Sequence, residues 1–434
     1  MYGKLFNYVR GLIAYLKFLK KQKGSEYVKM SYKELLYLSF FSAKKFLYFK
    51  NEIIRLNKKR IRERKKCKVG FVVYTTSMWS IDGLYRIMES EAQYEPSVIV
   101  VPFSDASAGT YETTKKYFKE KGYCLNTIDD ASFNINAYDI IIYTNPYVAI
   151  DKYINILNLR LEKLVTYVSY SYILSGKLEK LDLPVYFLSW KFFCDSEFYK
   201  KYVETKSRIY SNNAVFCGYP KMDDYFSTEE NNSHQYDSRK IIMYAPHQSV
   251  NRNDVRAATF DLNGWYMLYL AEKYKGKIYW IVKPHPLLRS HSVEAGLFKE
   301  ETAYDDYLKK WKETGAAKVL ENGDYFNLFK ESDAMVTDSI SFLAEYQFTG
   351  KPLLLLESGK QKYNEFGNSI REILYRCNGN DFVAIEQFLK DVSEGKDPMK
   401  STREFFFKAN LSYRNDTRIS ACENVYEIFK NEIL

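Results

Sequence analysis

The stretch from Glu321 to Glu357, ENGDYFNLFKESDAMVTDSISFLAEYQFTGKPLLLLE, predicts a β-turn-α-β unit. Its apolar pattern indicates a helix at Asp324–Lys330, a buried strand at Ala334–Thr337, a polar turn, a helix at Ser341–Phe348 and a strand at Leu353–Leu356. At the start of the second helix, backbone N–H groups lack intrahelical partners and the helix dipole is positive. The turn therefore predicts a phosphate site or, with equal weight, simple helix capping by Asp338, Ser339 and Ser341.

The same alternation of strands and helices runs through the chain from Lys68 onward. Further strands are predicted at Val69–Tyr74, 96–102, Asp139–Tyr147, Lys163–Tyr170, 184–190, 214–220, Ile241–Tyr244, Tyr279–Val282 and 316–321. Near-continuous apolar strands separated by helices are typical of a parallel sheet covered on both faces. We therefore predict an α/β protein with two facing doubly wound, Rossmann-like domains. The expected divisions are an arm at 1–67, domains at 68–230 and 231–400, and C-terminal helices at 401–434, with a polar linker near 225–240.

The positive charge of the chain is concentrated in its first 68 residues, which hold 20 Lys/Arg and 4 Glu, whereas the rest holds 44 Lys/Arg and 50 Asp/Glu. Because the body is slightly acidic, a nucleic-acid partner is disfavoured. In the first segment an apolar helix face is formed by Leu5, Val9, Leu12, Leu16 and Leu19, and most basic residues lie off that face. A second helical stretch is predicted from Tyr32 to about Lys66. The pattern predicts an amphipathic arm that binds an anionic membrane surface, with packing on the body or on another subunit as the alternative.

Cysteine usage and hydropathy exclude several classes of protein. The six cysteines are dispersed, without a CxxC pair or a histidine at metal-binding spacing, which predicts a reduced cytoplasmic protein without a zinc site. No apolar run approaches the length of a spanning helix, and the basic N-terminus does not resemble a signal peptide. We therefore expect a soluble or peripheral protein.

Polar residues follow three predicted strands of the second half: His247 after the first, Lys283 and His285 after the second, and Asp338 and Ser339 after the third. Because ligands bind outside the carboxyl ends of parallel strands, these loops should converge on one cleft. The cationic side chains of these loops, to which Arg289 can be added, and the serine hydroxyls are suited to bind a pyrophosphate. No cluster of carboxylates has the spacing of a metal site. We predict a nucleoside diphosphate bound without cofactor or obligatory metal, although a structural role is the alternative for each histidine alone. Neither GxGxxG nor a P-loop is present.

Several segments resemble the CDP-glycerol glycerophosphotransferase family of teichoic-acid and capsule polymerases. They are Lys283-Pro284-His285-Pro286, Thr337-Asp338-Ser339-Ile340-Ser341, Gly350-Lys351-Pro352, Gly218-Tyr219-Pro220-Lys221 and Tyr244-Ala245-Pro246. The resemblance covers about residues 68–380 and implies the GT-B fold, with the donor nucleotide on the C-terminal domain and the acceptor on the N-terminal domain. It also implies peripheral attachment at the inner face of the plasma membrane, because family acceptors are lipid-linked.

The resemblance implies that His285 is the donor-phosphate histidine, with Ser339 and Ser341 as phosphate or glycerol contacts. Lys283 and Asp338 occupy neighbouring motif positions, and Thr337 and Arg289 complete the predicted donor site. Two departures from the family pattern stand out: His247-Gln248-Ser249 replaces the family's arginine, and Ser169-Tyr170-Ser171-Tyr172 replaces a His-Gly pair whose histidine resembles a catalytic base.

The sequence therefore offers more than one candidate for the residue that accepts the proton in the reaction. His247 is one candidate base, or else a phosphate ligand in place of the arginine. Asp82 is another candidate base, with a helix N-cap as its alternative role. Trp79, Tyr170 and Tyr172 are expected on the acceptor side.

We predict a transferase that moves a glycerol-phosphate or related alditol-phosphate unit from a CDP-activated donor to a lipid-linked or oligosaccharide acceptor in cell-surface polymer synthesis. One alternative is a GT-B glycosyltransferase that uses a nucleotide sugar. A second alternative is a non-catalytic nucleotide-binding assembly subunit. The N-terminal helices could also mediate a homo-oligomer.

Overall fold

The computed structural model describes residues 52–433 except 65, 103–108, 148, 150–153, 177–182, 207–211, 228–237, 251–257, 322–324 and 415–418. The predicted amphipathic helix of the arm lies outside the described residues, as does most of the second helical stretch. The described part of that stretch is a helix at 52–62, which packs on the first unit. There the Asn57 amide donates to the Lys163 carbonyl at 3.1 Å, and Arg62 Nε donates to the Ile433 carbonyl at 2.7 Å.

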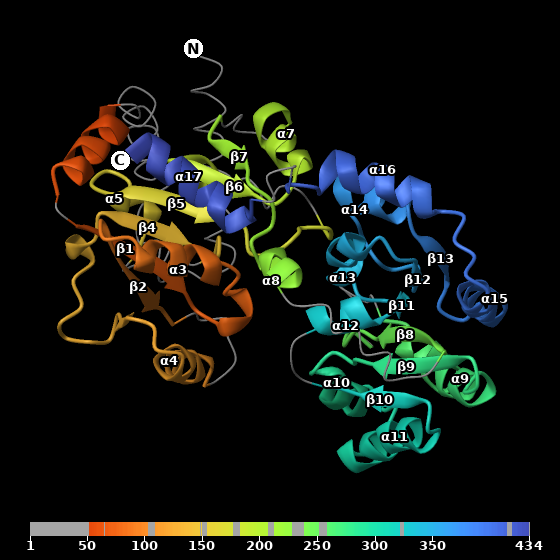
Figure 1. The fold of residues 1–434 in the computed structure, drawn as a ribbon. Coiled ribbons are helices and arrows are strands. Elements are labelled where there is room, and N and C mark those ends of the chain that lie inside the picture. Colours follow the sequence, from red (N-terminus) through yellow and green to blue (C-terminus); the bar gives the residue numbers. More distant parts are fainter. Residues whose placement is uncertain are drawn as a thin grey trace, which may run out of the picture. The chain divides into compact units, whose positions relative to one another are not determined.

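The chain forms two compact units, which are described separately (Figure 1). The first holds the described residues up to 171, 183–223 and 411–433, and the second holds 172–176 and 224–410. The predicted C-terminal segment 401–434 is thus shared between the two units. Each unit contains its own parallel sheet, which confirms the predicted fold class of two α/β domains.

The first unit is built on a seven-stranded parallel sheet with the order β3-β2-β1-β4-β5-β6-β7. Its strands are β1 (Cys67–Val73), β2 (Tyr94–Val100), β3 (Leu125–Thr127), β4 (Ile140–Tyr143), β5 (Leu164–Val168), β6 (Lys191–Cys194) and β7 (Ala214–Phe216). Its helices are α3 (Asp82–Ser90), α4 (Thr110–Glu120), α5 (Ile156–Leu159), α6 (Pro184–Leu188), α7 (Glu197–Thr205) and α17 (Ala421–Ile433), and α8 (Lys221–Ser227) crosses the division between units. Consecutive residues of β1 are buried on both faces of the sheet, as expected for a central strand covered by helices.

The C-terminal helix α17 completes the core of the first unit. Its apolar face, which includes Val425 and Phe429, joins the cluster formed by β1, β2 and α3. Asp223 holds the start of this helix, because its carboxylate accepts the N–H groups of Ala421 at 2.8 Å and Cys422 at 2.9 Å. The last helix of the chain is therefore fixed to residues that lie about 200 positions earlier in the sequence.

The second unit has a six-stranded parallel sheet with the order β10-β9-β8-β11-β12-β13. Its strands are β8 (Lys240–Ala245), β9 (Ile278–Val282), β10 (Ala317–Val319), β11 (Ala334–Thr337), β12 (Leu353–Glu357) and β13 (Tyr375–Asn378). Its helices are α9 (Phe260–Lys273), α10 (Leu288–Glu294), α11 (Glu301–Glu313), α12 (Phe326–Glu331), α13 (Phe342–Glu345), α14 (Glu365–Arg371), α15 (Phe382–Ser393) and α16 (Lys400–Asn410). The opening stretch thus forms α12, β11, α13 and β12 in the predicted order, with a second helix shorter than expected.

Two local predictions are wrong, and three strands were missed. The segment 184–190 was expected to be a strand, but its first part is the helix α6, which begins at Pro184 because proline suits the first turn of a helix. All five residues of α6 are buried, so its sequence carries no helical periodicity. The strands β3, β6 and β13 were not predicted. The helix expected at Ser341–Phe348 consists of the short α13 and a 3₁₀ turn at Tyr346–Thr349.

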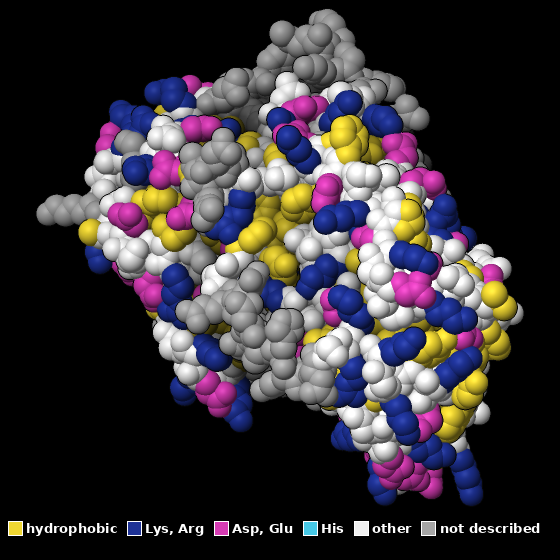
Figure 2. Space-filling view, turned by 45° about the vertical axis from the view of Figure 1, so that its right-hand side comes forward, with side chains coloured by type: hydrophobic (Ala, Val, Ile, Leu, Met, Phe, Trp, Pro, Cys, Tyr) yellow, Lys and Arg dark blue, Asp and Glu magenta, His cyan; other side chains and the backbone are white. Residues whose placement is uncertain are grey.

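The surface view of Figure 2 shows Lys and Arg side chains interspersed with Asp and Glu on the face that it presents. No single-sign field gathers among the described residues on that face, in keeping with the slightly acidic body. Over the described ranges, no helix is long and apolar enough to cross a membrane.

Candidate functional site

The carboxyl ends of four neighbouring strands form one edge of the second sheet. Strands β9, β8, β11 and β12 are adjacent and parallel, so the segments that follow them emerge on the same side. The His247 and His285 rings lie 5.5 Å apart between centroids, and the His285 N–H donates to the Pro246 carbonyl at 3.0 Å. The His247 N–H donates to Asp338 Oδ1 at 2.6 Å. The structure therefore brings the three predicted loops together.

Asp338 is the centre of this arrangement. Its buried carboxylate also accepts two bonds on Oδ2, from the Thr259 N–H at 2.5 Å and from the Thr259 hydroxyl at 3.0 Å. Burial raises the pKa of Asp338 to about 6 although these donors oppose the shift, so the group is ionised at pH 7. Asp338 is thus used to hold the segments that begin at His247 and Thr259, and it does not cap the following helix.

The two predicted histidines use the same ring nitrogen, Nδ1, as a hydrogen-bond acceptor. His247 Nδ1 accepts the Ser249 N–H at 3.2 Å, and His285 Nδ1 accepts the Leu287 N–H at 3.2 Å. In the neutral state each ring therefore carries its proton on Nε2. Burial, together with His285 and His291, lowers the pKa of His247 to about 4, and burial is also the main cause of the lowered pKa of His285. At neutral pH both side chains are N–H donors without charge.

A third histidine, His291 on α10, belongs to the same cluster and was missed by the sequence analysis. Its Nδ1 lies 3.1 Å from the Gln248 carbonyl oxygen and must donate to it, because a carbonyl only accepts. The side chain thereby fixes the loop that carries His247. In the sequence, the only indication that His291 belongs to the site was its position six residues after His285, on a short helix.

The two predicted cations differ in their partners. Lys283 is buried, its Nζ donates to the Glu321 carbonyl at 3.1 Å, and burial lowers its pKa while Glu321 opposes the shift. Arg289 pairs with Asp305 at 2.7 Å and with the Glu321 carboxylate at 3.0 Å. A phosphate would compete with two carboxylates for Arg289, whereas Lys283 has only a carbonyl as its hydrogen-bond acceptor among the described residues.

The hydroxyls of the turn after β11 have distinct places. Thr337 is buried, donates from Oγ1 to the Ala245 carbonyl at 2.6 Å and accepts the Ser339 N–H at 3.0 Å, which ties β11 to β8. Ser339 is also buried, whereas Ser341 is exposed. Ser341 stands at the N-cap of α13 but makes no side-chain capping bond. Simple capping by Ser341 is therefore wrong, and a short helix leaves little dipole for a phosphate.

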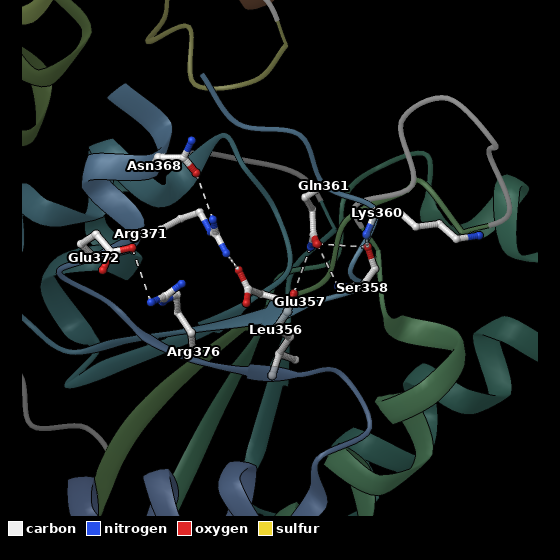
Figure 3. Close-up of polar contacts among 9 residues, drawn as sticks. All are labelled: Leu356, Glu357, Ser358, Lys360, Gln361, Asn368, Arg371, Glu372 and Arg376. Atoms are coloured by element: carbon white, nitrogen blue, oxygen red, sulfur yellow. Dashed lines mark hydrogen bonds and ion pairs between the residues drawn. The ribbon is translucent and has the colours of Figure 1, made fainter. Parts of the chain in front are cut away.

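The turn after β12 adds polar groups that the sequence analysis did not single out. Figure 3 shows the Arg371 side chain directed at Glu357, with Nε 2.9 Å from Oε1. Gln361 closes the turn, since its Oε1 accepts the Ser358 N–H at 2.9 Å and its Nε2 donates to the Leu356 carbonyl at 3.2 Å. An ordered polar turn thus lies one strand away from Asp338.

The residues predicted on the acceptor side belong to both units, and the candidate base Asp82 belongs to the first unit. The Trp79 ring packs against Phe118 with centroids 5.0 Å apart, inside the aromatic core of the first unit. Asp82 is the first residue of α3 and its carboxylate accepts the Tyr123 hydroxyl. The Tyr170 carbonyl accepts the Tyr219 hydroxyl at 2.7 Å, also in the first unit.

Tyr172 belongs to the second unit, where its ring lies 6.4 Å from the Phe366 ring. The segment that begins there is bound to the second unit by its backbone. The Asn364 N–H donates to the Leu174 carbonyl at 3.0 Å, and the Gly176 N–H donates to the Lys362 carbonyl at 3.1 Å. The three predicted acceptor-side residues are therefore divided between the two units, with Trp79 and Tyr170 in the first and Tyr172 in the second.

Among the described residues, no three His, Cys, Asp or Glu side chains lie close enough together to hold a metal ion. The polar groups at the edge of the second sheet include imidazole N–H groups, hydroxyls and the Lys283 ammonium. Such groups match the oxygens of a phosphate or diphosphate.

Comparison with known proteins agrees with this chemistry. The family model of CDP-glycerol:poly(glycerophosphate) glycerophosphotransferase matches residues 178–425. A comparison with curated proteins gave no match.

Solved structures share the fold at low identity. The wall teichoic acid polymerase TagF is 13% identical, with 90% of this chain and 98% of that chain covered and a TM-score of 0.52. UDP-GlcNAc 2-epimerase from Neisseria meningitidis, bound to UDP-GlcNAc, is 13% identical, with 84% and 98% covered and a TM-score of 0.52. The epimerase from Methanocaldococcus jannaschii, in complex with UDP-GlcNAc and UDP, is 13% identical, with 84% and 99% covered and a TM-score of 0.51. At such identities the likeness establishes the fold alone.

Proposed function

Because this chain belongs to the CDP-glycerol:poly(glycerophosphate) glycerophosphotransferase family, we propose that it transfers a glycerol-phosphate or related alditol-phosphate unit from a CDP-activated donor to a lipid-linked or saccharide acceptor. The family model matches more than half of the chain, and the chain is accordingly a transferase. A single transfer would add one unit to a cell-surface polymer of the teichoic-acid or capsule type, and repeated transfer would extend that polymer.

The observation that carries the proposal is the meeting of His247, His285 and Lys283 at one edge of the second sheet. Two neutral imidazoles with Nε2–H groups and one lysine ammonium supply donors and charge for a diphosphate. When the acceptor oxygen attacks phosphorus, the bond to cytidine monophosphate breaks and negative charge grows on the leaving phosphate. Preorganised donors stabilise that charge most when they need no rearrangement, and Asp338 holds their loops in place.

The donor can be identified directly. Full-length protein incubated with CDP-glycerol, CDP-ribitol or UDP-sugars and a lipid-linked oligosaccharide should add an alditol-phosphate mass to the acceptor and release CMP. We expect turnover to persist after chelation with EDTA, because the proposed site uses imidazole and ammonium groups. Mass spectrometry of the acceptor separates this outcome from glycosyl transfer. Addition of a sugar mass from a UDP-sugar, with no alditol-phosphate product from any CDP-alditol, would refute the proposal.

We also propose that the basic arm holds the enzyme at an anionic membrane, at the cytoplasmic face where lipid-linked acceptors are presented. A chain without residues 1–50 should no longer sediment with vesicles of anionic phospholipid, while full-length protein should sediment at low salt and less at high salt. The cut must leave the helix at 52–62, because Asn57 and Arg62 bind the body.

The matched control for the arm is the full-length double variant Leu12→Asp, Leu16→Asp, which keeps the basic residues and breaks the apolar face. It should bind vesicles more weakly than the wild-type chain. Equal sedimentation of truncated and full-length protein would remove the membrane role of the arm without affecting the donor assignment.

A further inference from the structure

An open groove lies between the helices α9 and α11 of the second unit (Figure 1). It has a volume of about 370 Å³ and is lined by Trp265, Leu268 and Tyr269 from α9 and by Lys310, Glu313 and Thr314 at the end of α11. Helix α9 leads from the carboxyl end of β8 to the amino end of β9, and α11 ends just before the amino end of β10. The groove therefore lies toward the amino ends of the strands, whereas His247 and His285 follow their carboxyl ends.

Two aromatic rings form the apolar part of this groove, and the fold holds both in place. Of the five tryptophans of the chain, all of which the structure describes, Trp265 alone is exposed, with 56% of its surface accessible. Its ring packs edge-on against Tyr307 with centroids 5.0 Å apart, and the buried Tyr307 hydroxyl donates to the Gly264 carbonyl at 2.8 Å. One turn along α9, the Tyr269 ring is 55% exposed and stacks on Tyr266. A ligand that stacks on these rings therefore finds them already ordered, which favours binding.

Charged side chains surround the two rings. The Lys310 ammonium lies 5.1 Å from the centroid of the Trp265 ring, and the carboxylates of Glu272 and Glu313 line the same groove. Each carboxylate pairs with an exposed lysine of its own helix, at 2.5 Å for Glu272 and 3.7 Å for Glu313. Exposed pairs of this kind contribute little to stability, so the hydroxyls of a ligand can replace them.

This combination favours a saccharide as the ligand. A pyranose ring has an apolar C–H face that packs on an aromatic ring, and a rim of hydroxyls that donate to carboxylates and accept from an ammonium. The volume falls within the range of about 300–1,000 Å³ that is typical of small-ligand sites. A phosphate polymer is disfavoured, because the groove is lined by two carboxylates and one ammonium. A second protein is disfavoured, because a stable interface takes about 20–30 residues on each side and the apolar part of this groove is Trp265, Leu268 and Tyr269.

We propose that this groove binds a saccharide ring that stacks on Trp265 and Tyr269. The carboxylates of Glu272 and Glu313 and the Lys310 ammonium bind the hydroxyls of that ring. The ligand is the saccharide part of the acceptor, a statement that rests on the proposed transfer function. Because the groove lies at the opposite end of the second sheet from the donor site, a bound saccharide leaves that site free for the nucleotide. The groove thereby keeps the acceptor on the enzyme between transfers.

Direct binding tests the groove without any need for turnover. Linear oligosaccharides of glucose, galactose or N-acetylglucosamine are titrated into the full-length protein and followed by calorimetry. At least one of them should bind to the wild-type chain, and Trp265→Ala should lower its affinity by about 10–100-fold, as expected for loss of a central aromatic contact. Tyr269→Ala should also weaken binding. Binding of no oligosaccharide, equal affinity in Trp265→Ala and Tyr269→Ala, or tighter binding of a glycerol-phosphate oligomer would overturn the inference.

Leu262→Ala is the matched control. Leu262 is an apolar residue of the same helix with 44% of its surface exposed, but it does not line the groove. This variant should bind the oligosaccharide with wild-type affinity. Tyr269→Ala removes a side chain of similar exposure and should melt near the wild-type temperature, so it tests the groove even if Trp265→Ala does not fold.

Kinetics separate this inference from the proposed function. With a saccharide-bearing acceptor, Trp265→Ala should raise the acceptor KM by about 10–100-fold, the loss of affinity expected for the free saccharide. An unchanged acceptor KM would refute the acceptor role of the groove while transfer itself stands. A wild-type chain that binds the oligosaccharide but transfers no unit from any CDP-alditol would refute the proposed function and leave the saccharide site. Self-association that Trp265→Ala abolishes, measured by analytical ultracentrifugation, would make the groove an interface between copies of this chain and overturn the inference.

Discussion

His285→Ala should lower kcat for transfer from CDP-glycerol by about 10²–10³-fold, the usual effect of removing one preorganised donor to a charge that grows in the transition state. The His285 ring is fixed by the Leu287 N–H on Nδ1 and stacks edge-on against His247, so its Nε2–H has a defined direction. Steady-state kinetics with release of CMP as readout would measure the loss.

The pH dependence of this loss is a second readout. Because the pKa of His285 is lowered, mainly by burial, the side chain donates as a neutral imidazole, and the effect of His285→Ala should be similar from about pH 7 to 9. The variant His285→Gln retains an N–H donor and should recover part of the activity. His291→Ala should cost less, because His291 supports the His247 loop through the Gln248 carbonyl. Full turnover by His285→Ala would remove the donor site from this edge of the sheet.

Asp338→Ala should reduce the free energy of unfolding by about 2–5 kcal/mol, because it leaves the buried Thr259 N–H and the half-buried His247 N–H without their acceptor. Urea unfolding followed by tryptophan fluorescence would measure the change. The His247 loop should also lose its fixed position, so transfer activity should fall beyond what the unfolded fraction explains.

Two graded variants isolate the cause of this destabilisation. Thr259→Val removes only the hydroxyl bond of 3.0 Å and should cost about 1 kcal/mol. Asp338→Asn keeps one oxygen acceptor, so its loss of unfolding free energy should lie between those of Thr259→Val and Asp338→Ala. Wild-type stability in Asp338→Ala would show that solvent replaces these bonds.

The fold could be predicted from the sequence because its strands are apolar runs bounded by polar turns, a pattern that is local. Residues 334–337 form the strand β11 as expected, and Asp338 follows its end. The local sequence pattern does not predict the secondary structure of a segment in which every residue is buried. The segment 184–188 is such a case, and only the proline at its start indicates a helix. Helix and strand cannot be distinguished by periodicity in such a segment.

The composition of the site was only partly predictable, since contacts between distant segments have no local signal. Lys283 and His285 follow a strand and were expected at the edge of the sheet. His291 enters the site only because α10 turns it back onto the Gln248 carbonyl.

The return of α17 to the first unit has a consequence for biosynthesis. The core of that unit includes Cys422, Val425 and Phe429, which leave the ribosome after every element of the second unit. Residues 224–410 can therefore complete their sheet during translation, while the earlier sheet waits for its last helix. The half that is made first is the half that finishes folding last, and until α17 emerges it exposes the apolar surface that α17 will cover.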